Sequence, residues 1–253
     1  MKVCFIYREK RETGFSIEEV FKNVRSALPL EIEQQEFKLD RGIGIFKNIR
    51  RLKRIDADIF HITGDCHYLA LFLPTKYTVL TIHDIRNVSV YKGIKGYTYR
   101  LVWFWLPLLK LKHITYISSF TKKSVAERFK INKGCVIHNP LTIKFNFSPR
   151  NEINKQVQIL QIGSTENKNI EKLIEAVKGE KYKLLLVRHK SEKIQSALER
   201  LGIDYEWYTN VSDKELFELY KKCDIVFFAS TYEGFGLPIL EAQKFGRPVI
   251  TSN

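Results

Sequence analysis

The stretch "STYEGFGLPILEAQ" (residues 230–243) lies where a strand passes into a helix. It follows the apolar run "DIVFFA" (224–229), and its second half opens the helix-like segment "LPILEAQKFG" (237–246). Open α/β sheets bind their ligands beyond the carboxyl ends of their strands. The stretch therefore predicts an α/β fold with a functional loop at the edge of a sheet.

The same alternation of strands and helices runs outward from this loop through the chain. The first half has predicted strands at 2–7, 32–39, 57–63, 77–84, 113–118 and 135–140, and helices at 16–28, 45–55 and 119–130. The second half has predicted strands at 157–163, 182–188, 205–208, 224–230 and 248–252, and helices at 169–179, 191–202, 212–223 and 237–246. This pattern favours mostly parallel sheets, so we expect two α/β domains, at 1–145 and 157–253, joined by a polar linker at 146–156.

Basic residues are concentrated in the first half. Residues 1–150 contain 27 Lys and Arg against 13 Asp and Glu, whereas the remainder contains 15 of each. A basic half suits an anionic membrane, a nucleic acid or a phosphorylated substrate. The basic helix 45–55 and the basic, aromatic segment 91–112 fit attachment to a membrane surface, but they fit a solvated face and core aromatics equally well. No nucleic-acid-binding module is recognisable, so nucleic acid is not an expected partner.

The cysteines and the apolar segments indicate a cytoplasmic protein. The four cysteines have no CxxC spacing, which favours buried thiols in a reducing compartment. The first residues resemble a strand and lack the features of a signal peptide. The most apolar stretch, 101–111, has 11 residues, whereas a spanning helix needs about 20. We therefore expect no transmembrane segment.

The loop carries two kinds of chemistry. Gly234 and Gly236 allow the backbone to approach a ligand closely, and the amides around Gly236 and Leu237 open a helix, which is a favourable site for an anion. The carboxylates of Glu233 and Glu241 accept hydrogen bonds from hydroxyl groups. Amides for phosphate and carboxylates for hydroxyls suit a sugar nucleotide. On spacing alone, an ordinary turn with an acid near a helix start explains the loop equally well.

Other motifs in the sequence are weaker evidence for a functional site. The sequence "DAD" (56–58) is a D-x-D that precedes a strand, and His61 and His67 have no third candidate ligand nearby, so we predict no metal site. The "GFG" of the loop lacks the third glycine of a dinucleotide fingerprint, because position 239 is Ile239. Ser212 and Glu215 have the spacing of a capping box at a helix start.

The segment 230–252 resembles the signature of the retaining glycosyltransferases of the GT-B fold, often called family 4. The E-x7-E motif of that family matches Glu233 and Glu241. The segments 159–177 and 211–230 are also similar to the family pattern, and parts of 57–141 are similar more loosely. The resemblance implies two Rossmann-like domains facing across a cleft, of which the first binds an acceptor and the second a nucleotide-diphosphate sugar.

The resemblance also implies roles for single residues. Glu233 would lie beside the donor sugar, Lys168 beside the donor diphosphate, and His83 would reach the donor sugar from the first domain. Asp84 would orient His83 or meet the acceptor. These four form the implied catalytic set. The implied donor-binding set, in which Glu241 holds the ribose, is Gly163, Gly234, Phe235, Gly236, Leu237 and Glu241, and Gly14 is the implied acceptor-side residue.

The chain departs from the family pattern at several points. Ser164 and Thr165 stand where members carry an arginine shortly after the glycine that matches Gly163. Arg188 replaces a glycine-containing turn and is a candidate substitute for that cation. Gly14 stands in place of a double-glycine loop. Members also continue beyond the last strand, so we expect the second domain to be incomplete.

The predicted function is therefore that of a retaining, metal-independent hexosyltransferase that needs no cofactor. Its donor would be a UDP- or GDP-linked sugar, and its acceptor a sugar or a lipid-linked sugar, in bacterial surface polysaccharide or lipopolysaccharide biosynthesis. The basic first half would hold it on the inner face of the plasma membrane. The alternative is a non-catalytic sugar-nucleotide-binding fragment or scaffold.

Overall fold

The computed structural model describes residues 1–8, 16–141, 147, 149 and 154–252. The chain divides into two compact units, Met1–Thr142 and Ile143–Asn253. The predicted linker 146–156 falls in the second unit, and part of it lies outside the described residues.

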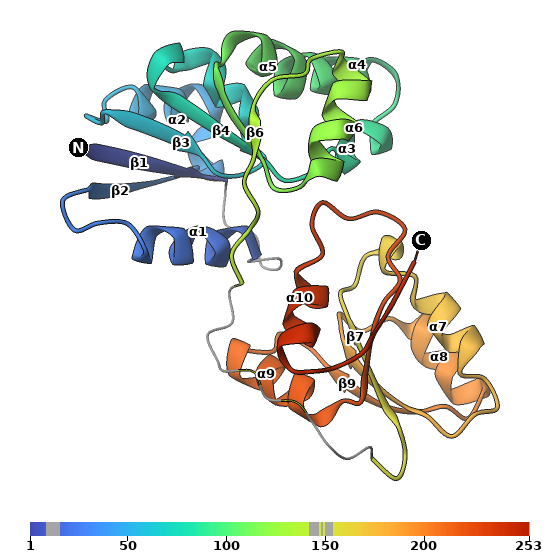
Figure 1. The fold of residues 1–253 in the computed structure, drawn as a ribbon. Coiled ribbons are helices and arrows are strands. Elements are labelled where there is room, and N and C mark those ends of the chain that lie inside the picture. Colours follow the sequence, from blue (N-terminus) through green and yellow to red (C-terminus); the bar gives the residue numbers. More distant parts are fainter. Residues whose placement is uncertain (9–15, 142–146, 148, 150–153, 253) are drawn as a thin grey trace. The chain divides into compact units, whose positions relative to one another are not determined.

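The first unit is built on a parallel sheet with the strand order β2-β1-β3-β4-β5-β6 (Figure 1). Its strands are β1 (Lys2–Tyr7), β2 (Glu33–Lys38), β3 (Ile59–Ile62), β4 (Thr78–Ile82), β5 (His113–Tyr116) and β6 (Cys135–Val136). Its helices are α1 (Ser16–Ser26), α2 (Gly44–Leu52), α3 (Arg86–Val90), α4 (Gly93–Tyr99), α5 (Leu106–Lys110) and α6 (Ser119–Phe129), with a π-helical turn η4 (Arg100–Trp105) between α4 and α5. Short 3-10 turns are η1 (Arg41–Ile43), η2 (His67–Phe72) and η3 (Thr75–Tyr77).

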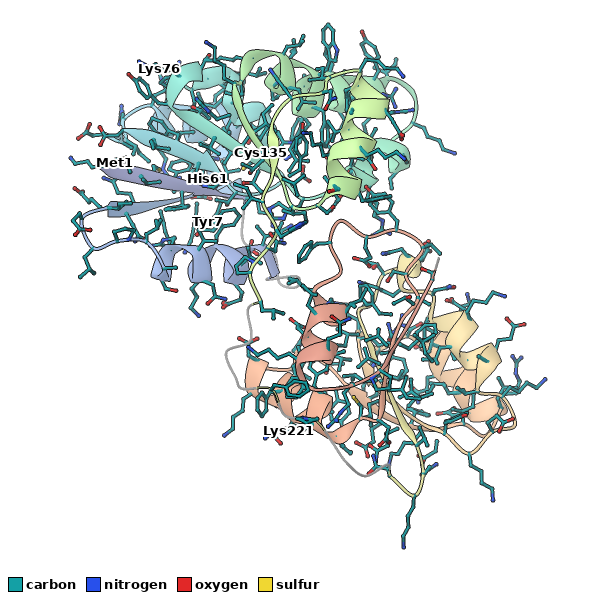
Figure 2. The ribbon with its side chains drawn as sticks, viewed as in Figure 1. Met1, Tyr7, His61, Lys76, Cys135 and Lys221 are labelled. Carbon is teal, nitrogen blue, oxygen red and sulfur yellow. The ribbon has the colours of Figure 1, made fainter. Side chains whose placement is uncertain are left out.

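Both faces of the first sheet are covered, as parallel sheets require. On one face a large core joins the strands to the helices of residues 44–129, including the fully buried Leu52, Leu108 and Tyr116. On the other face α1 packs through Phe21, whose ring lies 5.0 Å from that of His61. Figure 2 shows Tyr7 and His61 on the side of the sheet toward α1.

The second unit is built on a parallel sheet with the order β11-β10-β7-β8-β9. Its strands are β7 (Gln158–Ile162), β8 (Lys183–Val187), β9 (Asp204–Tyr208), β10 (Ile225–Phe228) and β11 (Val249–Thr251). Its helices are α7 (Ile170–Ala176), α8 (Glu192–Arg200), α9 (Asp213–Lys222) and α10 (Leu237–Lys244), and a 3-10 turn η5 (Glu166–Lys168) follows β7.

Alternation along β8 divides the second core into two layers. Leu184 and Leu186 join the cluster beneath α7 and α8, whereas Leu185 points to the opposite cluster, which includes Tyr220 of α9 and Phe245. Asp224 holds the start of β7 in place. Its carboxylate accepts hydrogen bonds from the backbone amides of Asn154 and Gln158 at 3.0 and 2.8 Å. The result is a doubly wound sheet with its strand ends aligned.

The predicted alternation is confirmed, since every predicted strand and helix has a counterpart in the structure, with ends that differ by a few residues. The helical segment 86–110 was not predicted. Glycines at 93 and 96 and a proline at 107 weaken its helical signal. Among the described residues, no helix is both long and apolar enough to cross a membrane.

The capping box at the start of α9 generates a stability prediction. Ser212 Oγ accepts from the amide of Glu215 at 3.3 Å, and Glu215 Oε2 accepts from the amide of Ser212 at 2.7 Å. Ser212→Ala should lower the free energy of unfolding of the second unit by about 1 kcal/mol.

The matched control is Ser191→Ala. Ser191 stands at the same N-cap position of α8 but makes no side-chain capping hydrogen bond. Urea unfolding of the two variants measures the difference, and an equal loss of stability in both would contradict the assigned role of the capping box.

Candidate functional site

The sequence loop at 230–243 lies at the switch point of the second sheet. Strands β7 and β10 are neighbours, and the chain order reverses between them. Gly163 follows β7 and Glu233 lies in the loop after β10. Ligands of open α/β sheets bind beyond the strand ends at such a point. The structure thus brings two separate parts of the predicted donor-binding set to one place.

Lys168 and Glu233 form an ion pair across this edge. Lys168 Nζ lies 2.6 Å from Glu233 Oε1, with 17% and 29% of the two side chains exposed. The ammonium group also lies 4.5 Å from the centre of the Phe228 ring. Asn167 supports the carboxylate by donating to Glu233 Oε1 at 3.3 Å and to the carbonyl of Tyr232 at 2.8 Å. The pair is therefore held in a fixed position at the sheet edge.

Two glycines of the predicted set have left-handed backbone conformations. Gly163 has φ +105°, and a Cβ there would lie 2.7 Å from Cε of Lys168. Glycine at 163 therefore lets the lysine side chain cross the turn. Gly236 has φ +91° and precedes the first residue of α10. A side chain at either position would strain the turn and crowd its neighbours.

Helix α10 begins directly behind this loop. Its first residues are Leu237 and Pro238, and a proline is well tolerated in the first turn because its missing N–H would have no partner within the helix. Gly236 has no side chain with which to cap the helix. An anion placed there can accept a hydrogen bond from the Leu237 amide, whereas Pro238 has no N–H and the Ile239 amide donates to the carbonyl of Gly236 at 3.0 Å. Gly234, Phe235 and Leu237 are partly buried around this position.

Glu241 is buried on α10, with 7% of its surface exposed. Its Oε2 accepts a hydrogen bond of 2.7 Å from the phenol of Tyr220. Burial and the nearby carboxylate raise the pKa of Tyr220, so the phenol stays protonated and donates. The structure thus places the second acid of the motif beneath the loop, with its direction set by α9.

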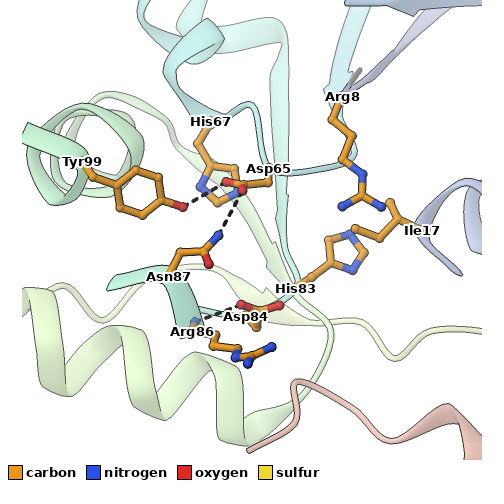
Figure 3. A pocket seen from close by; sticks show the side chains of 9 residues that line it. All are labelled: Arg8, Ile17, Asp65, His67, His83, Asp84, Arg86, Asn87 and Tyr99. Atoms are coloured by element: carbon orange, nitrogen blue, oxygen red, sulfur yellow. Dashed lines mark hydrogen bonds between the residues drawn. The ribbon is translucent and has the colours of Figure 1, made fainter. Parts of the chain in front are cut away.

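The first unit has its own polar pocket, shown in Figure 3, at the carboxyl ends of β1, β3 and β4. The cavity has about 180 Å³ and is lined by Arg8, Ile17, Asp65, His67, His83, Asp84, Arg86, Asn87 and Tyr99. The lining contains two arginines and two aspartates, and Arg8 is paired with Glu18 at 3.2 Å, so the pocket has no excess of positive charge. The predicted His83 and Asp84 both lie here. Gly14 lies outside the described residues.

Asp65 is oriented by two donors in this pocket. Its Oδ1 accepts from Tyr99 Oη at 3.1 Å, and its Oδ2 from Asn87 Nδ2 at 3.4 Å (Figure 3). Burial, followed by the charge of Asp65, raises the pKa of Tyr99 and keeps the phenol a donor. Sequence reasoning missed these three residues. Only the position of Asp65, three residues after the end of β3, could have indicated one of them.

His83 is held as one neutral tautomer. Its Nε2 lies 2.8 Å from the carbonyl oxygen of Thr63, so Nε2 carries the proton and donates. Burial lowers the pKa of His83 to about 4. Nδ1 is therefore a lone-pair acceptor at neutral pH. His67 is fixed in the same way, because its Nδ1 lies 3.0 Å from the carbonyl oxygen of Trp103 and burial lowers its pKa.

The aspartates of the D-x-D motif and His61, considered above as metal ligands, form contacts with other residues of the first unit. Asp56 pairs with Lys2 Nζ at 2.8 Å, and Asp58 accepts from the Lys2 amide at 2.7 Å. His61 Nε2 lies 2.8 Å from Thr81 Oγ1. Within the described part of the chain, no group of three or more His, Cys, Asp and Glu side chains lies close enough to hold a metal ion.

Comparison with known proteins identifies the class of this fold. Solved glycosyltransferase structures superpose on nearly the whole chain, although their sequences have diverged. HepE from Anabaena, crystallised with UDP and glucose, has a TM-score of 0.70 at 18% identity and covers 99% of this chain and 80% of its own. WaaG, a lipopolysaccharide glycosyltransferase, has a TM-score of 0.63 at 17% identity, with coverage of 98% and 80%. The fold is therefore the α/β GT-B fold, as predicted.

Sequence comparison relates the second unit to one family of glycosyltransferases. Residues 143–253, which make up the second unit, match the family described as glycosyl transferases group 1. The O-antigen chain mannosyltransferase RfbU of Salmonella typhimurium is 29% identical over 185 residues, which are 69% of this chain and 51% of RfbU. The serotype-specific mannosyltransferase WbdA of Escherichia coli is 37% identical over 78 residues. The chain thus spans about half the length of RfbU.

The tautomer of His83 can be measured directly. Long-range ¹H–¹⁵N spectra should show a neutral ring protonated at Nε2 from pH 8 down to about pH 5, because burial opposes the charged form. A His83→Gln variant assigns the resonance. An imidazolium pattern for His83 at pH 6 in the folded protein would contradict the assignment.

The same pKa shift predicts a pH dependence of stability. The unfolded His83 has its ordinary pKa of 6.5, whereas the folded value is about 4. The unfolded chain therefore binds the proton first as the pH falls, so the contribution of neutral His83 to stability is complete above about pH 6.5 and is lost toward pH 4.

Proposed function

We propose that this chain is a glycosyltransferase that moves a sugar from a nucleotide-diphosphate sugar to an acceptor hydroxyl with retention of configuration. The observation that carries the proposal is the Lys168–Glu233 pair, held beside Gly163 and the start of α10 at the switch point of a glycosyl transferases group 1 domain. Cations, amides and carboxylates at one edge match the phosphates and hydroxyls of such a donor. The relatives RfbU and WbdA, both named as mannosyltransferases, support a role in bacterial surface polysaccharide or lipopolysaccharide biosynthesis.

The proposed mechanism is positioning together with charge stabilisation. The bond between the anomeric carbon and the diphosphate oxygen breaks, and the acceptor oxygen bonds to the same carbon on the same face. The acceptor proton passes to the leaving phosphate oxygen. Lys168 and the amides of Gly234–Leu237 stabilise the negative charge that develops on that oxygen. Glu233 lies beside the sugar, and Glu241 holds the ribose hydroxyls. No metal or cofactor takes part in this scheme.

We propose that the acceptor binds in the pocket of the first unit. Its lining combines donors, such as Arg86 and the second N–H of Asn87, with acceptors, such as Asp65 and Nδ1 of His83. A hydroxyl group both donates and accepts, so a lining of both kinds suits a sugar. A pocket without excess positive charge favours an uncharged ring over a phosphate. The cavity of about 180 Å³ is small beside the roughly 300–1,000 Å³ of drug-sized sites, which suits a single sugar unit.

The donor test compares the two acids of the loop. UDP-, GDP- and ADP-sugars are screened by thermal shift, since a ligand at 100 times its Kd stabilises by about 2.7 kcal/mol. Transfer to sugar acceptors is then followed with the donor that binds. Glu241→Ala should weaken donor binding about tenfold, because a buried hydrogen-bond acceptor for the ribose is lost. Glu233→Ala should mainly slow turnover.

The matched control is Tyr220→Phe, which removes the hydrogen bond to Glu241 but keeps the carboxylate. It should retain most of the donor affinity. Equal donor affinity in wild type and Glu241→Ala would refute the ribose assignment. Donor binding without transfer to any acceptor would favour the alternative of a non-catalytic sugar-nucleotide-binding protein.

We also propose that the first unit attaches to the anionic inner face of the plasma membrane. Helix α4 exposes Ile94 and Tyr97 to 85% and 62%, and Trp105 on η4 is 43% exposed. Tyr97 and Trp105 line an open groove with Arg100 and Arg128. Exposed apolar and aromatic side chains beside arginines match the interface of an anionic bilayer.

Vesicle sedimentation tests the membrane proposal. The protein should bind phosphatidylglycerol-containing vesicles more tightly than phosphatidylcholine vesicles, and less tightly at high salt. The double variant Ile94→Ser/Tyr97→Ser should weaken vesicle binding at least about tenfold, because it removes two apolar side chains that would insert into the bilayer. Leu30→Ser is the control, since Leu30 is fully exposed beside Glu31. Equal binding by the double variant and the control would overturn the proposal.

A further inference from the structure

Arg188 is an unusual buried cation at the edge of the second sheet. It directly follows β8 and is only 7% exposed. Its backbone is fixed on β9, because its amide donates to the carbonyl of Tyr208 at 3.0 Å and its carbonyl accepts from Trp207 Nε1 at 2.8 Å. The side chain of Arg188 is therefore anchored at the carboxyl end of the strand next to β7.

The guanidinium group is poorly satisfied there. Nη2 lies 3.4 Å from the carbonyl oxygen of Ser164, a long hydrogen bond. Nε and Nη1 are buried and, in the described structure, have no hydrogen-bond partner. Burial lowers the pKa of Arg188, but a guanidinium stays protonated in proteins. Burying a charge without hydrogen-bond partners costs free energy. The arrangement therefore favours a ligand that supplies acceptors for the guanidinium N–H groups.

Unsatisfied polar atoms cluster at this edge. Among the described residues, seven buried side-chain nitrogen and oxygen atoms lack a partner, and five of them belong to residues at the ends of β7, β8 and β10. The five atoms are Gln161 Oε1, Asn167 Oδ1, Arg188 Nε, Arg188 Nη1 and Ser230 Oγ. Five of the seven atoms therefore lie at one edge of the second sheet, near Gly163.

The charges at this edge point to an anion. The positive charge of Lys168 is already balanced by Glu233 at 2.6 Å. Glu171 attracts Arg188 electrostatically, but its carboxylate is engaged by Lys193 at 3.4 Å. A diphosphate needs net positive charge at its site, and Arg188 adds it on the side of the Gly163–Ser164 turn that faces β8.

We propose that Arg188 is a donor-binding residue that contacts the diphosphate of a nucleoside diphosphate or nucleotide sugar. Its guanidinium turns from the Ser164 carbonyl to the phosphate oxygens when the nucleotide binds, so that Lys168 and Arg188 hold the diphosphate from two sides. Planar guanidinium groups suit phosphate through paired hydrogen bonds. The inference rests on the proposed donor site of the second unit.

Binding of UDP and GDP tests the proposal by calorimetry. Arg188→Gln should weaken binding of the preferred diphosphate about 10- to 100-fold, the range for a charge-assisted hydrogen bond. Arg188→Lys should restore part of the affinity. The loss should be smaller for the matching monophosphate and negligible for the nucleoside. Lys181→Gln, which removes an exposed charge at the opposite end of β8, should bind as wild type does.

The outcomes separate the possible failures. If the wild type binds neither UDP nor GDP, the proposed donor site fails and this inference fails with it. If the wild type binds and folded Arg188→Gln binds equally well, only this inference is overturned. An equal loss for the nucleoside and the diphosphate would assign Arg188 a purely structural role. Should Arg188→Gln not fold, Arg188→Lys carries the same test.

Discussion

Parallel strand pairing is the constraint on which the rest of this structure depends. Each unit has a sheet in which every strand points the same way, so all carboxyl ends meet at one edge. Residues far apart in sequence then become neighbours. Lys168 and Glu233 are 65 positions apart and still form a short ion pair. Arg8, Asp65 and His83 converge on one pocket in the first unit for the same reason.

The two edges differ in their electrostatic character. The edge of the second sheet has Lys168 paired with Glu233, Arg188 with two nitrogens that lack hydrogen-bond partners, and the start of α10. Together these groups favour an anion. The pocket of the first unit has no excess of positive charge and contains two imidazoles held neutral by burial. One edge therefore suits phosphate and the other suits hydroxyl groups. This division agrees with the proposed assignment of a donor site to the second unit and an acceptor site to the first.

Burial gives several site residues their chemistry. Glu241 is an acid with a fixed direction because Tyr220 donates to it inside the core between α9 and α10. His83 is a lone-pair acceptor at Nδ1 because its Nε2–H donates to the Thr63 carbonyl. In both cases a backbone or core partner, supplied by another element, decides which hydrogen bonds the side chain can still make.

The sequence by itself determined the alternation of elements, the α/β class and the position of the loop 230–243, because periodicity and turn residues are local signals. It also indicated the motif glutamates, Gly163 and Lys168. The tertiary structure alone decided the remainder. It paired Lys168 with Glu233, buried Glu241 against Tyr220, and gathered Asp65, Asn87 and Tyr99 into one pocket. It also left Arg188 buried with unsatisfied nitrogens. These properties depend on which strands and helices become neighbours, and contacts between distant segments leave no periodic trace in the sequence.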